Sequence, residues 1–108
     1  MSRRVNLRAE HEGRNARYLD AYLDGGDLHI DGQDLGPGTA SISSDGEYEW
    51  FQVIPRAHVP RLKNLLGAKP DEDILDVLER DWTGKRAGDL ERILRESDIP
   101  IAFSSWSG

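Results

Sequence analysis

Residues 18–31 read Tyr-Leu-Asp-Ala-Tyr-Leu-Asp-Gly-Gly-Asp-Leu-His-Ile-Asp, and this stretch decides the fold. Apolar and polar side chains alternate on both sides of Gly25-Gly26, which is the period of a half-buried strand. Two adjacent glycines favour a two-residue hairpin turn, because both central positions of a type I′ turn need a positive φ. The stretch therefore predicts two antiparallel strands joined by a tight turn.

A two-residue turn determines which residues lie opposite each other. Leu23 then faces Leu28 and Ala21 faces Ile30, so the apolar side chains, with Leu19, gather on one face. The polar pairs on the other face are Asp24 with Asp27, Tyr22 with His29, and Asp20 with Asp31. Two of these pairs oppose like charges, which costs up to ~1 kcal/mol a pair. The pattern predicts an acidic hairpin face opposite the face that the core covers.

Further strands are predicted on both sides of the hairpin. Before it, Val5, Leu7 and Ala9 alternate with polar residues. After it, a Gly- and Ser-rich loop at residues 36–46 leads to a strand at residues 47–54. That strand has aromatic or apolar side chains on both faces, which indicates a central strand covered on both sides or one with an exposed aromatic face.

The second half of the chain changes to a helical period. Helices are predicted near residues 59–66, from Pro70 to Trp82 with acids at 71–73 in the first turn, and near residues 88–96. Residues 99–106 then return to an extended pattern. Four strands, three helices and a returning strand indicate one α+β domain over residues 1–108. We expect about five strands in a mainly antiparallel sheet, with helices packed on one face.

Charge is segregated along the chain. Residues 18–54 hold eight acids and no Lys or Arg, whereas residues 55–70 hold four bases and no acid. The formal net charge of −6 argues against general nucleic-acid binding and against an anionic membrane surface. The chain lacks cysteine, a secretory signal and an apolar run of the about 20 residues that span a bilayer. Cytoplasmic residence is therefore expected.

The acidic hairpin face is the strongest candidate surface for a partner. The candidate partner-binding residues on it are Asp20, Tyr22, Asp24, Asp27, His29 and Asp31. Trp50 and Trp106 join them if their strands pair and place both side chains on that face, since Trp is enriched at binding hot spots. The alternatives are a solvated strand face for the acids and closure of the core for the two tryptophans.

Other kinds of site have weaker support. Asp20, His29 and Asp31 offer donors to a divalent cation, but spacing alone makes them only weak metal candidates. Residues 24–34 lack the spacing of a calcium loop, and residues 84–88 lack that of a phosphate-binding loop and fit a helix–helix turn. No serine lies in a nucleophile elbow. No catalytic residue and no cofactor are predicted, although an enzyme with an unrecognised site stays open.

Several segments carry a family resemblance. They are residues 31–36 (Asp-Gly-Gln-Asp-Leu-Gly), 47–50 (Glu-Tyr-Glu-Trp), 99–103 (Ile-Pro-Ile-Ala-Phe), the helical Val59, Leu62 and Leu66, and the break at Trp82-Thr83-Gly84. Over about residues 18–106 the chain resembles a family of small uncharacterised actinobacterial proteins. The resemblance implies no known activity, cofactor or catalytic residue.

Two functions follow as expectations. The first is a non-catalytic protein-interaction module whose acidic hairpin face engages a basic protein, as small acidic immunity proteins can mask basic nucleases electrostatically. The second is a small divalent-cation or ligand-binding module centred on Asp20, His29 and Asp31. Neither nucleic acid nor a membrane is expected as a partner, and the pattern carries no signal for an oligomeric state.

Overall fold

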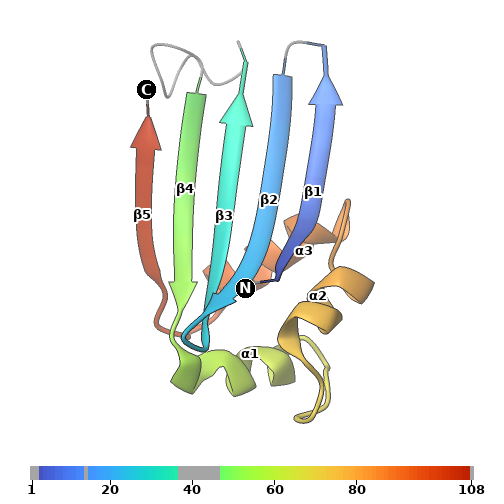
Figure 1. Ribbon diagram of the computed structural model, residues 1–108, viewed down its shortest axis with the longest axis vertical. Coiled ribbons are helices and arrows are strands. Elements are labelled where there is room, and N and C mark those ends of the chain that lie inside the picture. Colours follow the sequence, from blue (N-terminus) through green and yellow to red (C-terminus); the bar gives the residue numbers. More distant parts are fainter. Residues whose placement is uncertain (1–2, 14, 37–46, 108) are drawn as a thin grey trace.

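The computed structural model describes residues 3–13, 15–36 and 47–107. The elements follow in the order β1 (Arg4–Glu12), β2 (Asn15–Asp24), β3 (Asp27–Leu35), β4 (Glu47–Ile54), the 3-10 helix η2 (Arg56–His58), α1 (Val59–Leu65), α2 (Ile74–Asp81), α3 (Arg86–Glu96) and β5 (Ala102–Ser107). The strands form one antiparallel five-stranded sheet in the order β1-β2-β3-β4-β5 (Figure 1). The predicted α+β fold is confirmed. Of the predicted loop at 36–46, all but Gly36 lies outside the described residues.

The central hairpin has the predicted register. Asp24 pairs with Asp27, and the pairing continues without a shift to Ala16 and Leu35. Gly25 and Gly26 have φ values of 60° and 87°, the left-handed conformation that a two-residue turn requires. Turn chemistry and alternation of side chains therefore specify the same pairing.

One face of the sheet packs against the helices, and we call it the helix-side face. Its buried side chains join those of the helices in one hydrophobic core. The sheet contributes Leu19, Ala21, Leu28, Ile30 and Ile54, and the helices contribute Leu62, Val77, Leu78, Leu90 and Leu94. Fully burying a side chain of this size contributes about 1.5–3 kcal/mol, so this core holds the two layers together.

Strand β1 departs from the predicted alternation. Val5 and Leu7 are buried as expected, but the register shifts between Asn6 and Arg8. Ala9 is consequently exposed and lies opposite Tyr18, while Arg8 turns towards the helix-side face. The extra residue of a bulge exchanges the faces of all residues beyond it, and no local sequence signal marked its position.

Helix α2 begins later than predicted. Asp73 caps it, because its Oδ1 accepts hydrogen bonds from the backbone N–H groups of Leu75 (2.8 Å) and Asp76 (3.2 Å). Residues 71 and 72 precede the helix instead of forming its first turn. A carboxylate that bonds the backbone two and three residues ahead is typical of a cap, which explains why the helix starts at Ile74.

The ends of two other elements also differ from the prediction. Helix α3 starts at Arg86 rather than at Gly88, and β5 starts at Ala102 rather than at Ile99. Trp82, at the end of the apolar stripe of the second predicted helix, lies in the core with 6% of its surface exposed, and the Arg86 guanidinium carbon lies 4.4 Å from the centroid of its ring. None of the described helices is long and apolar enough to cross a bilayer.

The helices cover only part of the sheet. Figure 1 shows α1, α2 and α3 gathered at one end of the strands, while the opposite ends extend well beyond them. All three helices belong to the connection between β4 and β5, and α2 contacts β1 and β2, towards the other edge of the sheet.

Candidate functional site

The open face of the sheet is the face that no described helix covers. Opposed residues on antiparallel neighbours point to the same side, so the pairing gives its composition. Its residues include Arg4, Asn6, Tyr18, Asp20, Tyr22 and Asp24 from β1 and β2, Asp27, His29, Asp31 and Gln33 from β3, and Glu49, Phe51, Val53, Ala102, Ser104 and Trp106 from β4 and β5. All six predicted hairpin residues therefore share one face, as the sequence predicted.

A guanidinium from β1 lies between the two central carboxylates. Arg4 Nε is 3.1 Å from Asp20 Oδ2, and Arg4 Nη2 is 3.3 Å from Asp31 Oδ2. Asn6 donates a further hydrogen bond of 2.8 Å from its amide nitrogen to Asp20 Oδ1. The repulsion expected between the opposed aspartates is thus offset within the molecule, by a residue that the hairpin sequence alone does not contain.

The same Arg4 side chain also lies over the ring of Tyr22, which stacks on His29. The rings of Tyr22 and His29 are stacked, with centroids 4.7 Å apart and planes 13° apart. The Arg4 guanidinium carbon lies 5.0 Å from the Tyr22 ring centroid. Burial raises the pKa of the Tyr22 hydroxyl, and the charge of Asp31 raises it further. The ring geometry shows that His29 acts as a stacking partner of Tyr22.

At the tip of the hairpin the two aspartates differ in their surroundings. Asp24 is exposed, whereas Asp27 Oδ1 accepts a 2.8 Å hydrogen bond from the backbone N–H of Arg56. The Arg56 side chain also passes so close to Gly26 that a Cβ there would lie 2.5 Å from its Cδ. Asp27 thus ties the hairpin to the start of the helical connection, and Asp24 is the carboxylate that the tip presents to solvent.

The two tryptophans lie on opposite faces of the sheet. Strands β4 and β5 pair as the prediction required, but Trp50 lies opposite Ser105 and Trp106 lies opposite Glu49. Trp106 is on the open face with 51% of its surface exposed. Trp50 is on the helix-side face, where it packs against the core and stacks on Tyr48 at 5.7 Å. The expectation that both join the acidic face is therefore wrong for Trp50. Trp50 pairs with Ser105, and successive residues of a strand, such as Ser105 and Trp106, point to opposite faces.

Charge and apolar surface are divided across the open face. Among the side chains that the structure describes, the carboxylates of this face are those of Asp20, Asp24, Asp27, Asp31 and Glu49, and Arg4 supplies a guanidinium beside them. Four of these five acids belong to the hairpin, whereas Phe51, Val53 and Trp106 belong to β4 and β5. The open face therefore has an acidic half on β2 and β3 and a mainly apolar half on β4 and β5, and Glu49 of β4 adds a carboxylate to the apolar half.

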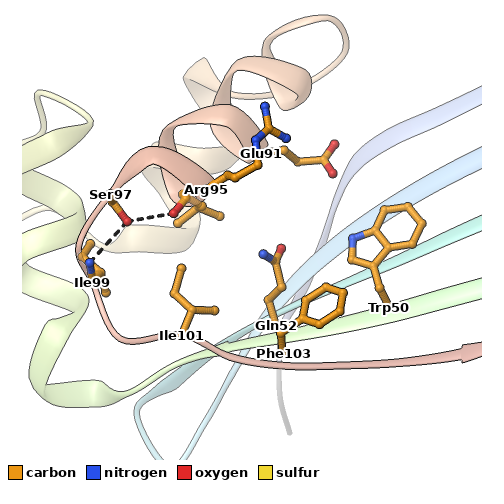
Figure 2. Close-up of a pocket in the computed structure, with 9 residues that line it drawn as sticks. Trp50, Gln52, Glu91, Arg95, Ser97, Ile99, Ile101 and Phe103 are labelled. Atoms are coloured by element: carbon orange, nitrogen blue, oxygen red, sulfur yellow. Dashed lines mark hydrogen bonds between the residues drawn. The ribbon is translucent and has the colours of Figure 1, made fainter.

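The helix-side face carries a second feature, a cleft between α3 and the strands β4 and β5. It has a volume of about 410 Å³ and is lined by Trp50, Gln52, Glu91, Leu94, Arg95, Ser97, Ile99, Ile101 and Phe103. Figure 2 shows Trp50, Gln52 and Phe103 projecting from the sheet on the side of α3, with Glu91 and Arg95 on the helix. Two aromatic rings, a carboxylate and a guanidinium therefore meet in one concave surface.

A group of charged residues borders this cleft. Arg8 Nη1 lies 3.2 Å from Glu91 Oε1, and Arg8 Nε lies 3.2 Å from Glu10 Oε1 without hydrogen-bond alignment. Next to them, Arg17 Nε lies 3.5 Å from Asp34 Oδ1. Burial raises the pKa of Glu91 and of Asp34, and the neighbouring arginines only partly counteract it. No local pattern in the sequence predicts this group, because it depends on the β1 bulge and joins residues 83 positions apart.

The weak metal candidates are not assembled into a site. Asp20 and Asp31 are opposed but hold Arg4, and His29 stacks on Tyr22. Over the described ranges, no group of three or more His, Asp or Glu side chains is arranged to hold a metal ion. Among the described residues, it is the Arg4 guanidinium that lies between these two carboxylates.

In comparisons with protein-family models, with curated proteins and with solved structures, no match to this chain was found. The resemblance to small actinobacterial proteins stays a prediction.

Proposed function

We propose that this chain is a non-catalytic module that binds a basic protein through the open face of its sheet. One observation carries the proposal: a face of five strands, uncovered by any described helix, combines five carboxylates among its described side chains with an exposed tryptophan. Immunity proteins that mask basic nucleases are a physical analogue of such a surface.

The two halves of the open face have different roles in the proposed binding. Exposed ion pairs contribute only about 0–1 kcal/mol each, so the acidic half acts mainly on the association rate and on specificity. The apolar half, with Trp106 half exposed beside Phe51, supplies the desolvated contact on which affinity depends. Association is therefore expected to slow strongly with salt, and dissociation to depend on Trp106.

The internal pairs of Arg4 determine which carboxylates a test must change. Reversing Asp20 or Asp31 would also break the contacts to Arg4 and Asn6 and disturb the sheet itself. Asp24 and Glu49 lie on the same face outside the Arg4 bridge, and Glu49 accepts one hydrogen bond of 3.1 Å from Gln33. The informative variant is therefore Asp24→Lys/Glu49→Lys.

The experiment is affinity capture from the native host lysate at low and at high salt, with three baits. They are the wild-type chain, Asp24→Lys/Glu49→Lys, and a control, Asp71→Lys/Glu96→Lys, which makes the same charge change at exposed positions of the helical half. We expect a basic protein on the wild-type and control baits at low salt, and its loss from the open-face variant and at high salt. Purified partner and Trp106→Ser then give the change in dissociation rate.

Equal capture by the open-face variant and the wild type would contradict the proposal. Loss of the partner from the control bait to the same extent as from the open-face variant would also contradict it. Binding would then depend on the net charge of the protein and not on this face. Circular dichroism of each bait establishes that the variants are folded before their capture is compared.

The cleft favours a second candidate function, the binding of a small ligand. Aromatic walls with a few convergent polar groups are typical of such sites, and Trp50, Phe103, Glu91 and Arg95 provide them here. A fragment library screened by NMR is expected to yield ligands that shift the Trp50 indole resonance and lose binding in Trp50→Leu. A screen in which every hit shifts Trp106 and none shifts Trp50 would exclude this candidate.

A further inference from the structure

Strand β5 ends the sheet, and its outer edge has no partner strand among the described residues. It reads Ala-Phe-Ser-Ser-Trp-Ser, without a charged residue and without proline, and its residues 102–106 are all exposed. Edge strands are usually protected against pairing by charges, proline or bulges. The other edge strand, β1, has both a bulge and the charged residues Arg4, Arg8 and Glu10. The β5 edge lacks these protections.

We propose that β5 pairs with β5 of a second copy of this chain, in antiparallel orientation, to form a symmetric dimer with one continuous sheet. Backbone N–H and C=O groups along an antiparallel edge are complementary to those of an identical edge, so a second copy fits without further features. A two-fold axis perpendicular to the sheet relates the copies, and each open face then continues into the other.

The side chains of β5 favour one register of this pairing. Two residues that pair across the axis must point to the same face of the sheet. Even-numbered residues of β5 therefore pair with even-numbered residues of the partner, and odd-numbered with odd-numbered. With the axis at Ser104, Trp106 lies opposite the partner's Ala102 and Phe103 lies opposite the partner's Ser105. Phe103 and Trp106 are the large apolar side chains of β5 and are 59% and 51% exposed. Each therefore lies against a small residue that leaves room for its ring.

The charge distribution is compatible with self-association at this edge. A net charge of −6 generally opposes it, but the hairpin carboxylates lie on β2 and β3, at least two strands from β5. Neighbouring strands are about 4.8 Å apart, which places these acids about 10 Å or more from the edge and roughly 20 Å or more from their counterparts. That separation exceeds the Debye length of about 8 Å at physiological salt. In the dimer the two apolar halves meet at the centre, with Glu49 of each copy one strand away on β4, and the hairpin carboxylates lie outside.

The test is sedimentation equilibrium over a wide range of protein concentration. For the wild type we expect the apparent mass to rise from 12.1 kDa towards twice that value. Ser104→Lys places two like charges face to face on the axis and is expected to keep the mass at that of the monomer. The matched control, Ala9→Lys, adds the same charge to an exposed position of the other edge strand and is expected to dimerise as the wild type does.

A charge-swap mixture makes the test specific to the register. Ser104→Lys and Ser104→Glu are each expected to be monomeric alone and to form a 1:1 heterodimer when mixed. Trp106→Ser changes no charge and is expected to dimerise more weakly than the wild type. It replaces the charged variants in the test if one of them does not fold. A wild-type chain that stays monomeric at every concentration would overturn the proposal and leave the edge to a strand of another protein. A Ser104→Lys chain that dimerises unchanged would overturn it as well.

Discussion

Gly32 is a residue whose missing side chain shapes the helix-side face. It lies between Leu19 and Trp50 in the register, and the six-membered part of the Trp50 indole lies directly over it. A Cβ built on Gly32 would be 2.1 Å from indole atoms Cε2 and Cζ2. Its φ is not positive, so space and not backbone conformation requires glycine here. This contact holds Trp50 flat on the sheet and places it as one wall of the cleft.

Gly32→Ala is therefore expected to destabilise the protein by about 1–3 kcal/mol, because the added methyl group displaces a packed indole. Urea unfolding followed by circular dichroism measures the loss. The control is the same change in a Trp50→Ala background, where the methyl group meets no ring and the additional loss should be small. Equal losses in both backgrounds would show that Trp50 is not the cause.

Helix α2 depends on one residue outside it. Asp73 accepts two backbone hydrogen bonds, and without them the N–H groups of Leu75 and Asp76 lose their side-chain acceptor. Asp73→Ala is expected to lower the free energy of unfolding by about 0.5–2 kcal/mol. Asp71→Ala removes the same charge two residues earlier, outside the helix, and should cost much less. Thermal unfolding of both variants makes the comparison, and equal losses would point to charge instead of capping.

Helix α3 and strand β1 are joined by an ion pair whose carboxylate has lost much of its hydration. Burial raises the pKa of Glu91 above its ordinary value of 4.5, although Arg8 lies 3.2 Å away. Between the unfolded and the folded pKa, the native state binds more protons than the unfolded chain does. The contribution of Glu91 to stability therefore falls as pH rises through that window, and recovers as pH falls.

The prediction concerns the difference in Tm between the wild type and Glu91→Gln. As pH is lowered from neutral towards 4.5, the wild type is expected to gain stability relative to the variant. Asp34 has a raised pKa too, but it is present in both proteins and largely cancels from the difference. A difference that is constant or that changes in the opposite sense would contradict the assignment.

For the whole molecule, one core joins all the helices to the sheet, so the layers are expected to unfold together. Leu78 is fully buried in that core, whereas Leu65 of α1 is 47% exposed. Leu78→Ala is expected to cost about 2–5 kcal/mol, and near- and far-ultraviolet circular dichroism should still give one coincident transition. Leu65→Ala, the same change at the surface, should stay within about 0.5 kcal/mol. Separate transitions would mean that sheet and helices are not one cooperative unit.

The sequence by itself determined the hairpin, its register and the α+β class. These rest on a two-glycine turn, a two-residue alternation and a change to helical spacing, which act over neighbouring residues. It also placed the six hairpin residues on one face, as the pairing of Asp24 with Asp27 through Asp20 with Asp31 confirms.

Only the tertiary structure decided what accompanies that face. Arg4 reaches Asp20 and Asp31, the β1 bulge brings Arg8 to Glu91, and Trp50 and Trp106 separate to opposite faces. The physical reason is the same in each case. Pairing between strands has a period of two, so a bulge or a one-residue difference in register exchanges the two faces, and residues distant in the chain carry no local signal of it.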